Sequence, residues 1–343
     1  MFFLTVLLCS VAHATIYYVK SDGNDSSNGL SWSTAFATLQ KALDVYTSGD
    51  QIWVAKGTYV PTSTYGLGDD ERLKHFRLKN NVKIYGGFTG IETSVNERRN
   101  FGVGQENETI LSGDIGEKGW SFDNCYHVFY HPVNLGLDST AVLDGFTIKG
   151  GQADGDNMHN FGGGMYNSPS SSKIVSCTFT NNSAFYCGGG MYNSSSYLIS
   201  TSCTFTNNIA QTGYGGGCIY NEQSFLTINN SIIWGNIACE GNGNQLYICG
   251  GGITTLNYSC YANGINDVHI SNGTFTATNH DITSDPMFIG SGEHPYLIYG
   301  NSPCVDAGNN DYVTEQYDIR GSGYPRKLDK TTGKAGTIDM GTY

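Results

Sequence analysis

The chain carries little charge, and little of that charge is positive. Charged residues make up 14% of its 343 residues, against about a quarter in an average soluble protein. The 18 Lys and Arg are outnumbered by 30 Asp and Glu, which leaves a formal net charge of −12. Nucleic-acid binding rests on Lys and Arg at phosphates, so this balance argues against a nucleic-acid partner. The aromatic content of 13% excludes a disordered chain.

Long apolar runs are also missing. The run from Phe2 to Leu8 is far shorter than the about 20 residues of a membrane span, and no other stretch could cross a bilayer, so we predict no transmembrane segment. The run precedes Ala12-His13-Ala14, which is an A-x-A cleavage pattern. We therefore predict a signal peptide at residues 1–14. The mature protein is then exported, and it is secreted or lies at the cell surface on the outer-membrane exterior.

The sequence has no C-x-x-C pair, which argues against a zinc ribbon or a thioredoxin-type site. Nine cysteines follow the predicted signal peptide, and an odd number leaves at least one thiol unpaired in a monomer. Export permits disulfides, but the spacing does not assign them.

Two motifs repeat with one spacing in the middle of the chain. Residues 177–182 and 203–208 both read Cys-Thr-Phe-Thr-Asn-Asn, an offset of 26, and residues 231–236 keep the same apolar and Asn positions after another 28. The motif Gly-Gly-Gly-Met-Tyr-Asn at 162–167 recurs at 188–193. Helical repeats would need apolar stripes with a period of 3.6 residues, which these segments lack. Three short strands with three turns fill about this length, so each unit predicts one coil of a parallel β-helix.

Alternation along the strands assigns side chains to the two faces. Equivalent side chains of successive coils should then stack as ladders, with the Asn residues at turns, where Asn tolerates left-handed backbone and bonds the local chain. The expected ladders are Phe179, Phe205 and Ile233; Met165, Met191 and Ile219; Asn182, Asn208 and Asn236; and Asn167, Asn193 and Asn221.

The ends of a solenoid need covers, because an open coil exposes apolar core and strand edges. Residues 34–46 predict a covering helix, since Phe36, Leu39 and Leu43 share one helical face and Ser33 or Thr34 can cap its start. We predict an N-terminal cap at 15–50, a β-helix at 51–290 and an irregular closing segment at 291–343. Polar insertions are expected at 61–75, 89–108 and 115–124.

The chain resembles exported right-handed parallel β-helix proteins of the pectin-lyase-like superfamily, of the Bacteroidota surface type. The opening segment from Tyr17-Tyr18-Val19 through Asp22-Gly23-Asn24-Asp25 is similar to that family's N-terminal cap, and Ser302 to Gly308 is similar to its closing motif. The Gly-Gly-x-Met-Tyr-Asn and Phe-x-Asn-Asn units resemble repeats of chlamydial polymorphic outer-membrane proteins. The resemblance implies an all-β, single-domain fold with a short capping helix. It does not fix function, because the superfamily holds lyases, hydrolases and adhesins.

Signatures of catalysis are scarce. A β-helix lyase needs an acidic cluster that holds Ca²⁺ and a Lys or Arg that takes a proton. Between residues 160 and 240 the charged residues are Lys173, Glu222 and Glu240 alone, and the other charges gather in the insertions. We interpret the charged insertions as solvated loops with salt bridges to the coil, and we keep a lyase or glycosidase site built from them as the alternative.

Two clusters of oxygen ligands suit Ca²⁺, which is the possible cofactor. Neither has EF-hand spacing, and turn-forming Asx chemistry is the preferred interpretation. The candidate ligands are Asp22, Asn24 and Asp25 in one cluster and Asp154 and Asp156 in the other. His127 and His131 are four residues apart on a predicted strand, about 13 Å, which is too far for one metal ion.

Tyr166, Tyr192 and Tyr220 each follow an inward Met or Ile, so they should point outward as a stripe with steps of about 4.8 Å. Such a stripe binds sugar rings or another partner if it is exposed. The preferred interpretation is a self-stacked ladder that stiffens the coil.

Three functions stay open. The first is a non-enzymatic adhesin or glycan-binding rod that contacts an extracellular polysaccharide or surface glycan at many points. The second is a polysaccharide lyase or glycosidase, and the third is a purely structural spacer.

Overall fold

A computed structural model describes residues 14–239, 242–292, 294–313, 318–321 and 337–342. The predicted signal peptide therefore lies almost wholly outside the described residues. None of the helices in the described ranges has the length and apolar character of a membrane span.

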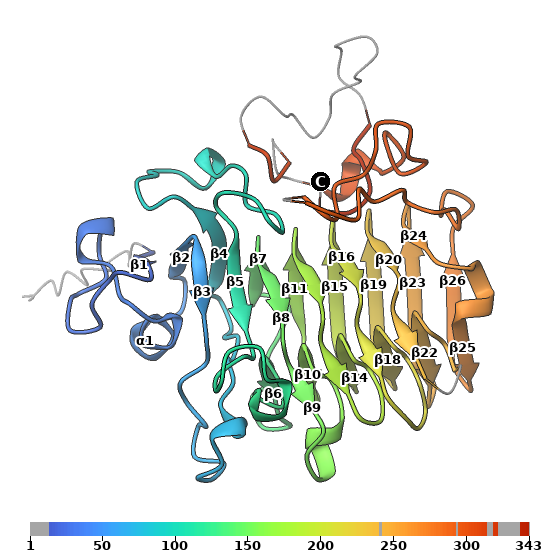
Figure 1. The fold of residues 1–343 in the computed structure, drawn as a ribbon, viewed down its shortest axis with the longest axis horizontal. Coiled ribbons are helices and arrows are strands. Elements are labelled where there is room, and N and C mark those ends of the chain that lie inside the picture. The colour runs from blue at the N-terminus through green and yellow to red at the C-terminus, as the bar shows by residue number, and fades with distance from the viewer. Residues whose placement is uncertain (1–13, 240–241, 293, 314–317, 322–336, 343) are drawn as a thin grey trace, which may run out of the picture.

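The described strands form four sheets, and every strand pair within them is parallel (Figure 1). Sheet A has nine strands in the order β1 (Ile16–Val19), β2 (Gln51–Ala55), β4 (Lys83–Phe88), β7 (Val142–Asp144), β11 (Ser172–Val175), β15 (Tyr197–Thr201), β19 (Phe225–Asn229), β23 (Ile253–Asn257) and β26 (Thr274–Ala277). Sheet B has seven, β3 (Gly57–Tyr59), β5 (Thr109–Ser112), β8 (Thr147–Lys149), β12 (Thr178–Thr180), β16 (Thr204–Thr206), β20 (Ile232–Trp234) and β24 (Cys260–Tyr261). Sheet C has six, β6 (Phe129–His131), β10 (Met165–Asn167), β14 (Met191–Ser194), β18 (Ile219–Glu222), β22 (Leu246–Cys249) and β25 (Val268–Ser271). Sheet D has four, β9 (Gln152–Ala153), β13 (Ser183–Ala184), β17 (Ile209–Ala210) and β21 (Ile237–Ala238).

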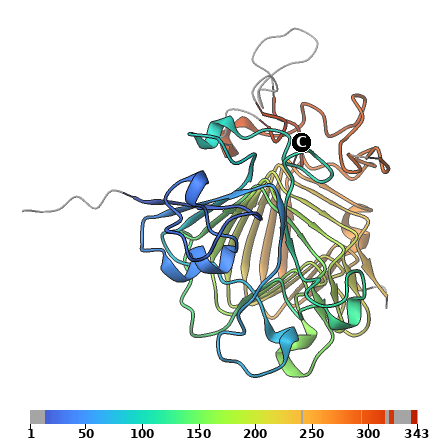
Figure 2. The same ribbon diagram turned by 60° about the vertical axis from the view of Figure 1, so that its left-hand side comes forward.

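Each regular coil visits the sheets in the order C, A, B, D, as β10 to β13 do. Strands of successive coils lie one behind another when the molecule is turned (Figure 2). The chain is thus the all-β, single-domain parallel β-helix that the repeats predicted. The spacing of 26 residues also sets the register, because Phe179 pairs with Phe205 and Met165 pairs with Met191.

The interior is a continuous apolar core along the solenoid. The rings of Phe179 and Phe205 are fully buried and stack with centroids 5.1 Å apart at an interplanar angle of 17°. Burial of a side chain of this size contributes about 2 kcal/mol, so the ladder is a main source of stability in the middle coils.

The glycine repeats mark the corner between sheets D and C, where neighbouring coils approach closely. A Cβ on Gly163 would lie 2.2 Å from the carbonyl oxygen of Ser183, and one on Gly189 would lie 2.3 Å from that of Ile209. No side chain fits such a gap. The Gly-Gly-Gly motif therefore recurs because each coil passes this corner.

The Asn ladders differ in part from the prediction. Left-handed backbone at the corner after sheet B belongs to the preceding residues, Asn181 and Asn207, with φ of 54° and 56°. The next residue points inward, and the amide of Asn208 joins those of Asn182 and Asn236 at 3.0 and 2.9 Å.

The second Asn set lies inside strands β10, β14 and β18 and not at turns. Because side chains alternate along a strand, each Asn points to the same inner face as the Met or Ile two residues before it. Asn167 donates to Asn193 at 2.9 Å, whereas Asn221 donates to Thr254 at 3.1 Å.

The capping helix is shorter than predicted. It is α1 (Leu39–Val45), and its N-cap is Thr38 rather than Ser33 or Thr34. The cause is Asp25, whose carboxylate accepts hydrogen bonds from the backbone N–H groups of Ala37 and Thr38 at 2.8 and 3.0 Å. These bonds hold the chain extended up to Thr38.

The described residues after 290 are irregular, and they lie along the outer side of sheet B (Figure 1). Their contacts reach several coils back. The hydroxyl of Tyr296 lies 2.9 Å from that of Thr180, and Thr342 bonds Thr204 at 3.1 Å. The segment therefore covers sheet B and leaves the outer face of sheet A free of it at Tyr197 and Phe225, which are 60% and 44% exposed.

Candidate functional site

The predicted tyrosine stripe is present as a column, but it is buried. Tyr166 is 3% exposed, and Tyr192 and Tyr220 are each 8% exposed. Their rings stack on one another with centroids 5.1 and 5.5 Å apart, and the column continues to Tyr130 and Tyr247. The three rings therefore form a self-stacked column and not an exposed stripe.

The corner between sheets D and C covers this column. Phe161 and Cys187 pack against the rings, and the hydroxyl of Tyr192 donates to Glu222 at 2.8 Å. Burial raises the pKa of Tyr166 to about 12. The stacked faces offer a sugar ring almost no surface, and a role of this column in binding stays a prediction.

The first predicted calcium cluster is a set of turns. Both carboxylate oxygens of Asp25 accept hydrogen bonds from residues 37 and 38, Asn24 accepts from the backbone of Ser26 at 2.9 Å, and Asp22 pairs with Lys20 at 3.3 Å. The oxygens are therefore partnered within the cap. Within the described ranges, no group of three or more His, Cys, Asp or Glu side chains is arranged to hold a metal ion.

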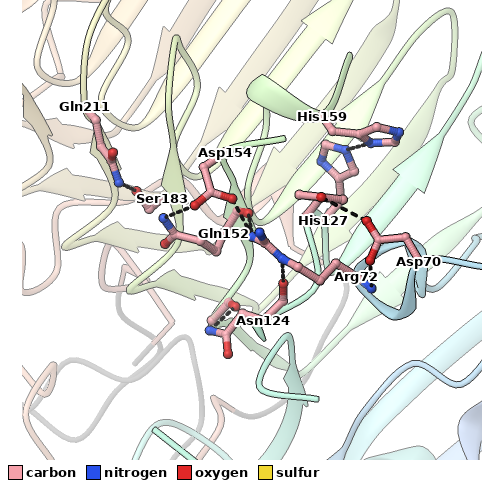
Figure 3. Close-up of polar contacts among 11 residues, drawn as sticks. Asp70, Arg72, Asn124, His127, Gln152, Asp154, His159, Ser183 and Gln211 are labelled. Carbon is pink, nitrogen blue, oxygen red and sulfur yellow. Dashed lines mark hydrogen bonds and ion pairs between the residues drawn. The ribbon is translucent and has the colours of Figure 1, made fainter. Parts of the chain in front are cut away.

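The second cluster is divided. Asp156 lies just before the short 3-10 helix Asn157–Asn160 and makes no capping hydrogen bond with its side chain. Asp154 instead forms an ion pair with Arg72 of the 61–75 insertion (Figure 3). The Asp154 carboxylate, a candidate ligand for Ca²⁺, is thus paired with a guanidinium.

Arg72 joins three separate segments in this region (Figure 3). Its guanidinium donates to the backbone carbonyls of Asn124 at 2.7 Å and Gln152 at 2.9 Å, and it lies 4.2 Å from the ring centroid of Tyr126. The charged insertions therefore make loop-to-coil contacts.

Two histidines lie beside this ion pair (Figure 3). His127 Nδ1 lies 3.0 Å from the carbonyl oxygen of Gly162, and His127 Nε2 lies 3.0 Å from His159 Nδ1. A carbonyl only accepts, so His127 is protonated on Nδ1 and His159 donates to it. Burial lowers the pKa of both imidazoles, and both are neutral at pH 7. This arrangement anchors the 154–161 corner to β6.

His131 also acts in packing. It is fully buried, its Nε2 accepts from the backbone N–H of Leu78 at 3.0 Å, and its Nδ1 lies 2.7 Å from the Asn167 carbonyl oxygen. Burial lowers its pKa to about 4.

A surface that the sequence analysis missed lies on the outer face of sheet A. One side chain from each of eight strands falls in a single register row, which we name the central row. It contains Gln51, Lys83, Val142, Lys173, Ile199, Thr227, Thr255 and Thr276. Strands in a sheet are about 4.8 Å apart, so the central row runs along the solenoid axis.

The first half of the central row lines an open groove of about 430 Å³. Its polar walls come from Asn81, Ser139 and Thr140, and no carboxylate is among its described lining residues. Lys83 and Lys173 both line it and are exposed. The two lysines flank Val142 in register, so their strands are about 10 Å apart. The groove is a local positive site on an acidic protein.

Beyond Lys173 the same face carries an exposed aromatic pair. Tyr197 and Phe225 stack with centroids 4.8 Å apart at an interplanar angle of 4°. Because Ser172 pairs with Leu198, the neighbour of Tyr197 on the groove side is the small residue Ser171. One face of the Tyr197 ring therefore turns toward the groove.

The sequence holds a signal for this surface. Tyr197-Leu198-Ile199 and Phe225-Leu226-Thr227 repeat an aromatic residue followed by Leu, at an offset of 28. Lys173 stands out as one of three charges in the repeat region. The pairing of Lys83 with Lys173 could not be found, because they lie 90 residues apart and the strands between them are irregularly spaced.

Comparisons with known proteins add little to this picture. No family model matches the sequence, and no curated protein matches it. Among solved structures, the chain is similar to pectate lyase Pel9A, with 12% identity over 97% of each chain and a TM-score of 0.37. It is also similar to a rhamnogalacturonan lyase, with 18% identity, a TM-score of 0.31, and coverage of 76% of this chain and 56% of that one. At these values the function has to be argued from the residues of this chain.

Proposed function

We propose that this protein is an exported, non-enzymatic β-helix that binds acidic glycans along the outer face of sheet A. The observation that carries the proposal is the groove with Lys83 and Lys173, which continues into the exposed Tyr197–Phe225 pair on the same face. Export follows from the predicted signal peptide and belongs to the same proposal.

The two lysines would make the groove select negatively charged glycans. Neither side chain has a hydrogen bond or ion pair among the described residues, so both ammonium groups are free to meet carboxylates or sulfates of a ligand. Charge-assisted hydrogen bonds to such groups are stronger than neutral ones. The side-chain amide of Asn81 lines the same groove and can bond hydroxyl groups of a ligand, whereas the Thr140 hydroxyl is already engaged by Asp138 and by the backbone N–H of Asn81.

The aromatic pair supplies the apolar contact. Exposed ring surface next to polar groups marks a binding surface, and the C–H face of a sugar ring suits the free face of Tyr197. The threonines at the far end of the central row, Thr227 and Thr255, add hydroxyl partners at steps of about 4.8 Å.

Binding to immobilised acidic and neutral polysaccharides tests the proposal. We expect retention of an acidic polysaccharide such as polygalacturonate and a loss of at least about tenfold in affinity for the Lys83→Gln, Lys173→Gln double variant. The matched control replaces Lys56 and Lys118, which are exposed elsewhere, and it changes net charge equally. Equal losses of affinity in the two double variants would show that net charge alone causes the effect, and this result would contradict a binding site at Lys83 and Lys173.

The contribution of the Tyr197–Phe225 pair is tested separately. Tyr197→Ala should weaken retention of the same polysaccharide, whereas Tyr214→Ala, at a residue 62% exposed on another corner, should not. A product that absorbs in the ultraviolet on incubation with acidic polysaccharide and Ca²⁺ would replace this proposal with the lyase alternative. If the protein binds none of the polysaccharides, the structural spacer is the function that remains.

A further inference from the structure

The closing segment meets the last strand of sheet B at two cysteines. Cys260 begins β24, and Cys304 lies in the segment that runs back over sheet B. Both are fully buried. They pack in one apolar cluster with Ile232, Ile298 and Met340, separate from the main core.

The two cysteines share this small cluster, and their side chains interact, while the Cys260 thiol donates to the carbonyl oxygen of Ser284 at 3.3 Å. The backbone holds both in place, because Cys260 lies in an isolated bridge with Ile282 and the carbonyl of Cys304 accepts from Met340 at 3.0 Å. Two buried cysteines of one small cluster, each held by backbone hydrogen bonds, form a candidate pair for a disulfide.

We propose that Cys260 and Cys304 form a disulfide that fastens the closing segment to the solenoid. The oxidant is a small-molecule or protein disulfide. One cysteine thiolate attacks it, forms a mixed disulfide and releases the first thiol. The second cysteine then attacks the mixed disulfide and releases the second thiol, so two protein thiols are oxidised and one external disulfide is reduced.

The geometry also sets the order of events. The hydrogen bond to Cys304 and burial raise the pKa of Cys260, and a buried thiol reacts slowly because the thiolate is the nucleophile. The exchange therefore takes place before the closing segment is fully docked. Once formed, the bond is enclosed by Ile232, Ile298 and Met340 and is protected from reductants.

Peptide mapping tests the linkage. The protein is folded in a buffer of reduced and oxidised glutathione, alkylated in denaturant and digested without reduction. No Lys or Arg lies between the two cysteines, so cleavage at Asp267, Asp281 and Asp285 is used to separate them. We expect one peptide pair linked through Cys260 and Cys304 and two fewer titratable thiols than the reduced chain has. Free thiols at both positions, or a linkage of either one to another cysteine, would overturn the proposal.

Thermal unfolding provides the second measurement. The bond closes a loop of 44 residues (304 − 260), so reduction with dithiothreitol or Cys304→Ser should lower Tm by about 5 °C. Cys239→Ser is the control, because Cys239 is exposed and away from the cluster. If Cys304→Ser fails to fold, the comparison of oxidised and reduced wild-type protein decides. Equal Tm values in that comparison would contradict a fastening role.

Discussion

Arg72 shows how one residue can hold an insertion to a solenoid. Its guanidinium contacts two other segments of the chain, one at Asn124 and one at Gln152 and Asp154, and its side chain is 20% exposed. Arg72→Ala would remove the ion pair with Asp154 and the hydrogen bonds to the carbonyls of Asn124 and Gln152. We expect a loss of about 2 kcal/mol in the free energy of unfolding, measured by urea denaturation.

A neighbouring ion pair gives the control for Arg72. Lys74 pairs with Glu71 in the same insertion, but Glu71 is 75% exposed. Lys74→Ala should therefore cost less than about 0.5 kcal/mol. Equal losses in the free energy of unfolding for the two variants would show that the contacts of Arg72 with other segments add no stability beyond that of an exposed ion pair.

His131 makes the stability of the protein depend on pH. Burial lowers its pKa to about 4 from a usual 6.5, so the unfolded chain binds a proton more readily than the folded one. The stability from neutral His131 is complete above about pH 6.5 and is lost progressively as the pH falls toward 4. The shift corresponds to about 3 kcal/mol.

The variant His131→Gln isolates this contribution, because an amide can accept from Leu78 and donate to Asn167 without titrating. Urea denaturation at pH 7.5 and pH 4.5 gives the loss of stability for each protein. We expect this loss to be about 3 kcal/mol smaller in the variant than in the wild type. An equal loss in both would assign the acid sensitivity to other groups.

For single residues, the sequence predicted the face to which a side chain points better than it predicted the residues that cover that side chain. Alternation placed Tyr192 on the face opposite Met191, and the structure agrees. It could not show that the D–C corner covers the ring, because that cover comes from residues such as Phe161 and Cys187, which lie outside the strands. The ion pair of Asp154 was missed for a related reason, since its partner Arg72 is 82 positions away.

At the scale of elements, the Asn ladder ties each coil to the next. Asn208 is fully buried, its carbonyl oxygen accepts from Asn182, and its amide donates to Asn236 and to the Phe179 carbonyl at 2.9 Å. Asn208→Ala would leave several buried polar groups unpaired. We expect a loss of about 3 kcal/mol in the free energy of unfolding, measured by urea denaturation.

The matched control is Asn181→Gly, one coil away at the same corner. Asn181 is exposed and has a φ of 54°, which glycine adopts without strain. That variant should stay within about 0.5 kcal/mol of the wild type. A similar loss in both variants would mean that the corner conformation, and not the ladder, carries the stability.

The repeats predicted elements well where local and long-range signals agreed. A spacing of 26 residues with identical motifs fixes which strand follows which, and it gave the pairing of β12 with β16 directly. The start of α1 was misplaced because a distant carboxylate, Asp25, competes for the backbone that a helix at Thr34 would use. Helix propensity alone does not report such a competitor.

At the scale of the whole molecule, the closing segment decides which face of the solenoid stays exposed. It covers sheet B through contacts at Thr180 and Thr204, and the D–C corner covers the tyrosine column. The outer face of sheet A stays open along the solenoid axis. A linear ligand laid on that face meets the lysines first and the aromatic pair next.

Under the proposed function, this arrangement would make binding depend on glycan length. Lys83 and Phe225 are four strand spacings apart in sheet A, which is about 19 Å. A short acidic oligosaccharide reaches only the lysine groove, whereas a longer one also contacts Tyr197 and Phe225, and the second contact is then intramolecular. Calorimetry with size-fractionated acidic oligosaccharides should show affinity rising until about 19 Å is spanned and then levelling.

Phe225→Ala should lower the affinity for long oligosaccharides and leave the affinity for short ones unchanged. If Phe225→Ala weakened all lengths equally, or if a disaccharide bound as tightly as the polymer, the two contacts would not belong to one extended surface.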